Sequence, residues 1–444
     1  MTTSTSATLD FVSLQGIKTL ETLIPPVPNG IEETGLSATA IEQQILKTLY
    51  FRGETMGREL STALGLRFSL IEMMMEGLKR TQAVQVKRSL GMGSLTSYFS
   101  LSEAGRTRAR EYLETNQYTG PAPVPLYQYT YLARRQKQVE GWLTKELLAH
   151  AYRRIVISPQ ILSQIGPAVS SGNSFLIYGQ PGNGKTFLAE ALANIDQSCI
   201  YMPYAIEHQG SIIQIYDPTH HQIVNDEKST SALFEPLHDG RWFKCRRPFI
   251  ETGGELTLDM LDLSYNEVSK IYDAPFQLRA NNGIYLIDDF GRQRVTPAEV
   301  LNRWIVPMER RSDYLSLRTG GKITVPFEAF LVFSTNLKPH ELGDEAFLRR
   351  IQYKMLLRNP GPEEFTQIFV NFCQSRELPC PEGLVELFIK KRYRAIGRPF
   401  RRCHPRDVIS HAIDIIHFED LPYALTEDLL DSAFESCFIE DAED

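Results

Sequence analysis

The sequence predicts an α/β fold: a five-stranded parallel sheet, an all-helical domain after it and a small α+β domain before it. Three observations support this prediction. Short apolar runs separated by helical stretches recur between residues 155 and 360, as a parallel sheet requires. From Pro362 onward the apolar spacing is helical only. A glycine-rich segment, residues 179–186, lies between an apolar run and a helix, which is the setting of a phosphate-binding loop.

Length and composition are those of a multidomain globular protein. The chain has 444 residues, of which 42% are hydrophobic and 23% are charged, so we expect two or three domains. The sequence contains no apolar run of about 18 residues, the length that a membrane-spanning helix needs, so no membrane insertion is expected. The first residues lack the basic start and the apolar core of a signal peptide, which predicts a cytoplasmic protein.

The six cysteines are scattered along the chain and form no C-x-x-C pair. This spacing argues against a zinc site and against a disulfide framework. We expect reduced, partly buried thiols, including Cys373 and Cys380, which span a turn flanked by proline.

The N-terminal region divides into an arm and a small domain. Residues 1–30 are expected to form a flexible arm that ends in a proline-rich segment. Residues 31–118 show three helical stretches, a two-stranded hairpin over 84–101 and a final helix from Glu103. This order of elements resembles a winged-helix domain, which implies docking onto DNA or onto a protein.

Three further regions follow along the chain. Residues 119–150 are expected to be a linker, because the segment 120–125 is rich in proline and therefore stiff and extended. Residues 151–360 are expected to hold the sheet, and residues 361–444 a lid of four helices. The five predicted strands cover residues 175–178, 200–202, 284–287, 330–333 and 353–357.

The glycine-rich segment predicts the chemistry of the main site. The expected nucleotide-binding residues are Gly179, Gln180, Pro181, Gly182, Asn183, Gly184, Lys185, Thr186 and, one position further into the helix, Phe187. Glycines let backbone N–H groups curl around a phosphate at the positive end of the following helix. We expect Lys185 to contact the β- and γ-phosphates of ATP, and the Thr186 hydroxyl to hold Mg²⁺. A plain glycine-rich turn with an exposed lysine would not require a strand before it and a helix after it.

A second segment carries two adjacent carboxylates. The apolar run 284–287 ends in Asp288 and Asp289. Beside a phosphate-binding loop, the first carboxylate is expected to hold Mg²⁺, and the second to orient and deprotonate the attacking water. The alternative is a solvated Asp-Asp turn, which the neighbouring loop makes the weaker interpretation.

These segments, together with three later ones, resemble the AAA+ ATPase superfamily over residues 155–444. In that resemblance Asn336, at the end of the apolar run that begins at residue 330, would position the hydrolytic water. Arg350, with Arg349 as the alternative, would be the finger that reaches the γ-phosphate bound by a neighbouring subunit. Arg406, which opens a lid helix, would turn back toward the phosphates.

Residues 280–289 and 301–309 look closest to the bacterial branch that holds MoxR-type, magnesium-chelatase and enhancer-binding ATPases. The resemblance implies Mg²⁺-dependent ATP hydrolysis between the subunits of a homo-oligomeric ring, with a hexamer as the first expectation. It also implies chaperone-like remodelling of a macromolecular partner, in the first place a protein. Most of the family has Asp-Glu where this chain has Asp288-Asp289, and the shorter Asp289 predicts slower hydrolysis. A small-molecule kinase fits poorly, because the later segments would have no role in it.

Charge patterning leaves a second function open. Residues 79–110 contain seven basic residues and one acidic residue. In a winged helix, Lys87 and Arg88 would lie on DNA phosphates while the helix from residue 68 entered the major groove. Glu72 and Glu76 on that helix would face the groove badly. An ATP-switched DNA-binding regulator that uses residues 31–118 is therefore the alternative function.

The stretch between Lys185 and Asp288 is longer than a compact core needs. Within it, the basic and aromatic segment from Arg241 to Arg247 could grip a polypeptide or a nucleic acid, or could form a plain surface hairpin or subunit contact. The pair His220-His221 is expected to form a polar turn, because no third metal ligand lies nearby in the sequence.

Overall fold

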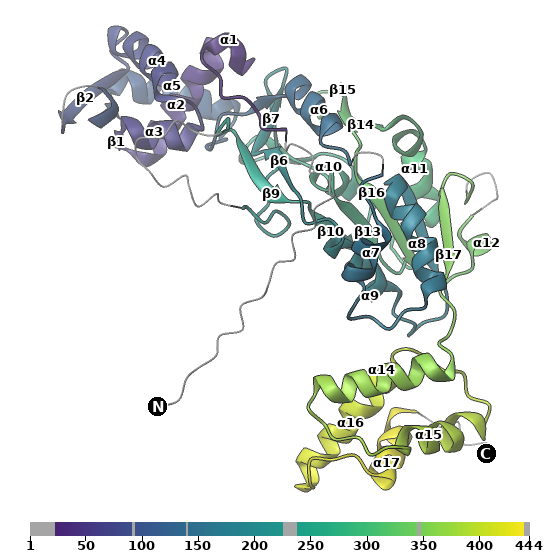
Figure 1. Cartoon of the computed structure of the whole chain (residues 1–444). Coiled ribbons are helices and arrows are strands. Elements are labelled where there is room, and N and C mark those ends of the chain that lie inside the picture. The colour runs from purple at the N-terminus through teal and green to yellow at the C-terminus, as the bar shows by residue number, and fades with distance from the viewer. Residues whose placement is uncertain (1–22, 91–93, 139–140, 225–237, 344–347, 439–444) are drawn as a thin grey trace, which may run out of the picture.

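The structure is a computed structural model that describes residues 23–90, 94–138, 141–224, 238–343 and 348–438. An N-terminal domain, a central α/β region and a C-terminal helical domain follow one another along the molecule (Figure 1). Residues 1–22 of the predicted arm fall outside the described residues. In its proline-rich end, Pro25 and Pro28 are buried, and the Pro25 carbonyl accepts a hydrogen bond from the backbone N–H of Asp239 at 3.1 Å. Within the described ranges, no helix is long and apolar enough to cross a lipid bilayer.

The N-terminal domain contains the elements that the sequence predicts for residues 31–118. They are α1 (Ile31–Thr34), α2 (Ala38–Arg52), β1 (Thr55–Met56), α3 (Gly57–Leu64), α4 (Phe68–Arg80), β2 (Val84–Ser89), β3 (Ser97–Leu101) and α5 (Glu103–Thr115). The three strands form an antiparallel sheet in the order β1-β3-β2. Apolar side chains from α2, α3, α4 and β3 share one buried core, which includes Ile45, Leu60, Ile71 and Phe99. The predicted turn at residues 91–93 lies outside the described residues.

The segment expected to be a linker is built into the interior. Residues 119–150 contribute β4 (Val124–Pro125), α6 (Leu126–Arg135) and the start of α7 (Lys145–Ala151). Strand β4 pairs with a strand of the central region, and Val124 and Tyr129 are fully buried. The Tyr129 hydroxyl accepts a hydrogen bond of 2.7 Å from the Asn281 side chain. Proline-rich composition predicted the extended backbone of this segment but not the apolar face that it buries.

The central sheet is parallel and five-stranded, as predicted. Its strands are β5 (Ser174–Tyr178), β10 (Phe249–Thr252), β13 (Ile284–Ile287), β16 (Phe330–Thr335) and β17 (Tyr353–Leu356), in the order β10-β13-β16-β5-β17. Four of these strands are the predicted ones. The fifth prediction is wrong: the run 200–202 lies in β6 (Cys199–Pro203), which pairs antiparallel with β9 (Trp242–Arg246) away from this sheet. Strand β10 takes the fifth place.

Helices cover both faces of the central sheet. On one face α8 (Pro159–Ser171) packs against Phe175 and Ile177 of β5. On the other, α11 (Pro297–Arg310) packs through Trp304 in a cluster that includes Leu176 of the same strand. The strand alternates between two hydrophobic layers, as a strand buried on both sides must.

The long stretch before Asp288 adds a second sheet. This sheet has the order β11-β12-β8-β7-β4, and its further strands are β7 (Ala205–His208), β8 (Ser211–Gln214), β11 (Ser264–Asn266) and β12 (Ile271–Asp273). The hairpin of β14 (Ser312–Ser316) and β15 (Lys322–Pro326) and the short α10 (Phe276–Arg279) lie beside it.

The basic and aromatic segment that begins at Arg241 is mostly internal, so it is not an exposed gripping surface. Arg241 is 1% exposed, and its guanidinium donates to Asp239 and, at 2.8 Å, to the carbonyl of Thr34. Trp242 and Phe243 belong to a buried core that they share with Val124, Ile206 and Ile213 of the second sheet. A buried arginine needs such partners, because leaving its charge unpaired in the interior would cost several kcal/mol, about 3–5 by typical measurements.

His221 is buried in the same region and is neutral. Its Nδ1 accepts from the backbone N–H of Asp217 at 3.0 Å, and its Nε2 lies 3.1 Å from the carbonyl oxygen of Arg279. Burial lowers the pKa of His221 to about 4. The ring is therefore part of a packed polar turn.

Acidification from about pH 6.5 to about pH 4 is expected to destabilise the protein through His221. The unfolded side chain takes up its proton near pH 6.5 and the folded one near pH 4, so the unfolded state binds more protons between these values. The contribution of neutral His221 to the free energy of unfolding is complete above pH 6.5. It is lost as the pH falls towards 4, by about 3 kcal/mol in all. Urea unfolding across this range should show a shallower pH dependence for His221→Asn than for the wild type. An unchanged pH dependence in the variant would contradict the assignment.

The C-terminal domain has the four predicted helices. They are α14 (Pro362–Ser375), α15 (Leu384–Ile389), which continues as a π-helical turn through Arg394, α16 (His404–Glu419) and α17 (Glu427–Cys437). Phe365, Phe369, Phe388 and Phe434 lie in one core shared by these helices. All six cysteines of the chain are free thiols.

Candidate active site

The glycine-rich loop joins β5 to α9 (Lys185–Glu190) at the carboxyl end of the central sheet. Gly182 has φ 77° and Gly184 has φ 78°, backbone conformations that glycine adopts without a steric penalty. A Cβ on Gly182 would lie 2.6 Å from Sγ of Cys403, in the lid. The backbone N–H of Cys403 donates to the Gly182 carbonyl at 2.9 Å. The loop and the lid therefore touch where a larger residue would not fit.

Lys185 lies at the centre of the site and is 6% exposed. Its Nζ donates to the carbonyls of Gly179 and Gln180, both at 3.1 Å, and to Oδ1 of Asn336 at 2.6 Å. Burial lowers the pKa of Lys185, whereas the nearby carboxylates of Asp289 and Asp288 act in the opposite direction. The loop thus folds around its own lysine, which holds the ammonium at the mouth of the loop.

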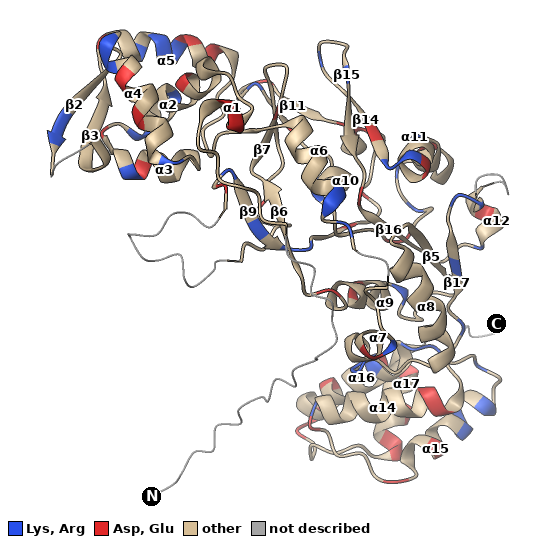
Figure 2. Ribbon diagram, turned by 45° about the horizontal axis from the view of Figure 1, so that its top comes forward, with Lys and Arg blue, Asp and Glu red and all other residues tan. Residues whose placement is uncertain are grey.

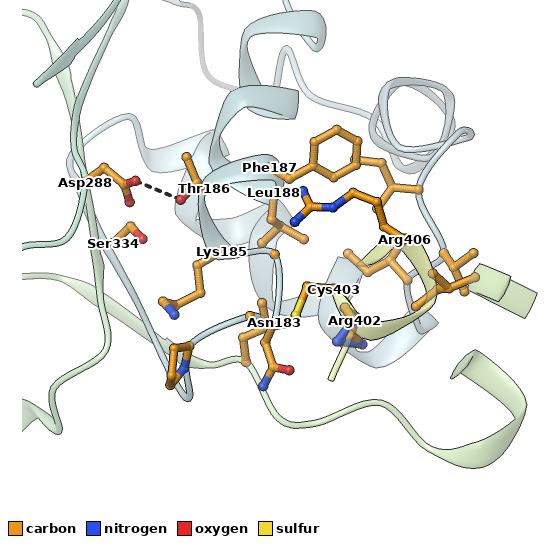
Figure 3. A pocket seen from close by; sticks show the side chains of 18 of the residues that line it. Asn183, Lys185, Thr186, Phe187, Leu188, Asp288, Ser334, Arg402, Cys403 and Arg406 are labelled. Carbon is orange, nitrogen blue, oxygen red and sulfur yellow. Dashed lines mark hydrogen bonds between the residues drawn. The ribbon is translucent and has the colours of Figure 1, made fainter. Parts of the chain in front are cut away.

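Thr186 and Asp288 meet beside this lysine. The Thr186 hydroxyl donates to Oδ2 of Asp288 at 2.8 Å (Figure 3). Oδ1 of Asp288 is buried, and no hydrogen-bond partner for it lies in the described part of the chain. Gln293 donates to the carbonyl of Asp288 at 2.8 Å and fixes the backbone at the end of β13. A hydroxyl and a carboxylate with one free oxygen are hard oxygen donors, so these two residues fit Mg²⁺.

Asp289 and Asn336 form the next layer of the network. Nδ2 of Asn336 donates to Oδ1 of Asp289 at 2.9 Å, while Oδ1 of the same amide accepts from Lys185. Asp289 is exposed and has φ 47°, which turns the chain sharply after β13. The structure therefore brings five predicted residues together: Lys185, Thr186, Asp288, Asp289 and Asn336.

A cavity of about 860 Å³ opens in front of this network. Much of its wall comes from residues that the sequence analysis did not select: the segment 154–157, Arg292 and Ser334 from the α/β region, and Ile368, Asn371, Phe372, Ser375, Arg402 and Cys403 from the lid. Phe187, which is 57% exposed, also lines the cavity. The apolar segments 154–157 and 368–372 have no motif, so no sequence signal distinguished them from ordinary core residues.

The lid arginines differ in where they lie relative to this cavity. Arg406 lines it beside Phe187, on the side away from Asp288, and pairs with Asp407 at 2.9 Å (Figure 3). Arg401, which the sequence analysis did not select, lies at the loop itself. Its guanidinium donates to Oδ1 of Asn359 at 3.0 Å, and the same oxygen accepts from Asn183 at 2.8 Å.

Arg349 and Arg350 lie apart from the cavity. Arg350 pairs with Glu309 at 3.1 Å and borders a separate hollow of about 250 Å³ beside the start of β5. Arg349 is exposed. Neither side chain lines the cavity of its own chain.

Replacing Gly182 with alanine is expected to weaken nucleotide binding about tenfold. The new Cβ would meet Cys403, and the left-handed backbone would add strain, together on the order of 1–3 kcal/mol. Equilibrium titration with a fluorescent ATP analogue measures the effect. Adding Cys403→Ala should restore part of the affinity, because it removes the clash and leaves only the backbone strain. Wild-type affinity in Gly182→Ala would show that the lid contact is not needed.

Comparison with known proteins adds little to this geometry. A family described only as a domain of unknown function (DUF8689) matches residues 361–436, the lid helices. No curated protein matches the sequence. The solved structures that match this chain include NtrX from Brucella abortus in complex with ATP. The match has 12% identity over 75% of this chain and 64% of NtrX, and a TM-score of 0.39. They also include the RuvB Holliday junction branch migration motor from Thermotoga maritima, with 14% identity over 68% of this chain and 72% of RuvB, and a TM-score of 0.35. This chain spans less than two thirds of NtrX, and at these TM-scores neither likeness supports an inference about function.

Proposed function

We propose that this protein is a Mg²⁺-dependent ATPase of the AAA+ type. The observation that supports it most directly is the connected network at the mouth of the cavity, where Lys185, Asn336 and Asp289 are joined by hydrogen bonds and Thr186 bonds Asp288. A cation, a metal-binding pair and a carboxylate base close together are what phosphoryl transfer needs. The parallel sheet and the loop after its β5 strand support the same proposal.

The residues of the chain divide the work as follows. Lys185 and the backbone N–H groups of the loop bind the β- and γ-phosphates, and the Thr186–Asp288 pair holds Mg²⁺. Bound there, Mg²⁺ would offset the negative charge of these phosphates. Asn336 orients the attacking water, and Asp289 accepts its proton. The apolar lid residues and the segment 154–157 enclose the adenine base of ATP, with Arg406 at the lid side of the cavity.

Release of phosphate from ATP tests this proposal. The purified chain should release phosphate from ATP when Mg²⁺ is present. Phosphate release should stop when EDTA removes the cation, while ATP still binds with a lower affinity. A chain that binds no ATP under either condition would rule the proposal out.

We further propose that the site is completed by a neighbouring subunit. Arg350, or Arg349 beside it, lies outside the cavity of its own chain, so it can meet a γ-phosphate only across an interface. A homo-oligomeric ring, with a hexamer as the first expectation, would bring each arginine to the ATP cavity of the neighbouring subunit. The ion pair with Glu309 holds Arg350 near the surface in the single chain.

A protein is the partner that we propose, ahead of DNA. The basic residues of the N-terminal domain are interspersed with acidic ones on the neighbouring helices (Figure 2). Several are paired: Lys79 with Glu76 at 2.8 Å, Arg88 with Glu54 at 3.0 Å, and Arg108 with a glutamate of α2. Paired cations neutralise fewer phosphates, and phosphate contacts supply most non-specific DNA affinity.

Binding of the full chain to a short duplex at several salt concentrations tests the DNA alternative. We expect weak binding with little salt dependence, unchanged in Lys87→Glu. Tight binding with a steep salt dependence that Lys87→Glu reduces would favour the ATP-switched DNA-binding regulator instead. Lys87 is a suitable probe because it is exposed on β2, outside the ATP site.

A further inference from the structure

Ser334 carries a buried hydroxyl that the fold leaves without a partner. The residue lies on β16 and is 1% exposed, and its Oγ has no hydrogen-bond partner among the described residues. It lines the ATP cavity proposed above. Burying a hydroxyl without a partner costs about 1–3 kcal/mol, so such a group in a folded protein needs a reason.

A second unpartnered polar atom lies on the neighbouring strand. Strands β13 and β16 run parallel with Ile287 opposite Phe333, so Asp288 and Ser334 are each the next residue along. Oδ1 of Asp288 also lacks a partner in the described part of the chain. Figure 3 shows the Asp288 and Ser334 side chains on one wall of the cavity, on the same side as Lys185. Two unsatisfied oxygens of adjacent strands therefore face one small region.

The surrounding backbone fixes Ser334 in this position. Its carbonyl accepts from the backbone N–H of Phe290 at 2.7 Å, which ties β16 to the turn after the two aspartates. The next residue, Thr335, uses its hydroxyl differently: it donates to the carbonyl of Phe290 at 2.5 Å and accepts from the N–H of Leu337 at 3.1 Å. The Thr335 hydroxyl thus makes hydrogen bonds that stabilise the fold, whereas the Ser334 hydroxyl makes none among the described residues.

We propose that Ser334 is a positioning residue for the Mg²⁺ site. Its hydroxyl would hydrogen-bond a water of the cation's hydration shell, next to the free oxygen of Asp288. Mg²⁺ keeps several waters when it binds to proteins, and groups that hold such outer ligands typically change metal affinity about 10- to 100-fold. This inference rests on the proposed function, because it assigns a residue to the cation of that same site.

A buried serine hydroxyl can stabilise the fold or act on a bound ligand, and Ser334→Ala distinguishes these two roles. If a serine hydroxyl stabilises the fold, removing it makes the protein less stable. Ser334→Ala removes a group that the fold leaves unsatisfied, so the thermal midpoint should stay the same or rise. Cation binding should weaken at the same time.

Binding of Mn²⁺, measured by electron paramagnetic resonance with a non-hydrolysable ATP analogue present, tests the proposal on the full chain. We expect Ser334→Ala to bind Mn²⁺ about 10-fold more weakly or worse, with the affinity for the analogue in EDTA and the thermal midpoint not reduced. Thr335→Val is the matched control: it removes the neighbouring buried hydroxyl, so it should lower the thermal midpoint and leave the Mn²⁺ affinity unchanged.

Two results would overturn the inference. Wild-type Mn²⁺ affinity in Ser334→Ala would show that the hydroxyl does not act on the cation. Equal losses of analogue affinity with and without the cation would show that Ser334 shapes the loop instead. A wild-type chain that binds no analogue would instead count against the proposed function itself, and this outcome is recognised without any variant.

Discussion

Lys185→Ala is expected to lose ATP binding and hydrolysis almost completely. The Lys185 ammonium lies inside the glycine-rich loop and joins it to Asn336. Removing one such electrostatic contact at a reaction centre typically costs about 10²- to 10³-fold in rate. Phosphate release and equilibrium binding of ATP should both fall. The thermal midpoint should not fall, because burial disfavours the charged ammonium of Lys185 and lowers its pKa.

Lys185→Arg is the matched control for charge. It keeps the positive charge but replaces a compact ammonium with a planar guanidinium that the loop carbonyls of Gly179 and Gln180 cannot surround in the same way. We expect a rate nearer to that of Lys185→Ala than to the wild type. Full activity in either variant would show that the cavity is not where ATP reacts.

Asp289→Asn is expected to separate binding from hydrolysis. Asparagine has the shape of aspartate, so the hydrogen bond from Asn336 at 2.9 Å can persist while the base is lost. Loss of a general base typically costs about 10²- to 10⁴-fold. The variant should therefore bind ATP with near wild-type affinity and release phosphate at least about 100 times more slowly, which rapid-quench measurements can resolve.

Asp289→Glu is the informative partner of that variant. It introduces a carboxylate side chain that is one methylene longer and would reach further into the cavity from the sharp turn at φ 47°. We expect hydrolysis at least as fast as in the wild type. If Asp289→Asn hydrolysed ATP at the wild-type rate, the base would have to be another residue.

The local parts of the site could be predicted from the sequence. Glycines at fixed spacing before Lys185 and Thr186, and two aspartates after an apolar run, specify backbone shape and charge within a few residues of each other. The structure brings them together because β5, β13 and β16 are adjacent parallel strands whose carboxyl ends meet at one edge. The roles of these residues in catalysis stay predictions that the variants above test.

Sheet membership could not be predicted in the same way. The run 200–202 is buried although it lies outside the central sheet, whereas β10, which joins that sheet, exposes Glu251. Periodicity and apolar content therefore do not say which sheet a strand joins. The buried faces of β4 and α6 were missed for a related reason, because proline and tyrosine composition describes the backbone and not its packing partner. Burial of Arg241 depends on Asp239 and on Thr34, which is some 200 positions away in the sequence.

The lid side of the cavity was also beyond sequence reasoning. Ile368 and Phe372 are ordinary apolar helix positions, and only the fold of the lid over the loop turns them into cavity walls. Arg401 reaches the loop through Asn359, a contact that depends on the path of the chain between β17 and α14. The unpartnered oxygens of Asp288 and Ser334 become visible only once every hydrogen bond around them is known.

The most direct test of the central claim is ATP turnover per chain as a function of protein concentration, for the wild type and for Arg350→Ala and Arg349→Ala, with native mass read in parallel. We predict Mg²⁺-dependent turnover that rises as a ring assembles and collapses in one of the two arginine variants, although both still bind ATP. Turnover that is independent of assembly and untouched in both variants, or no turnover at any concentration despite tight ATP binding, would contradict it.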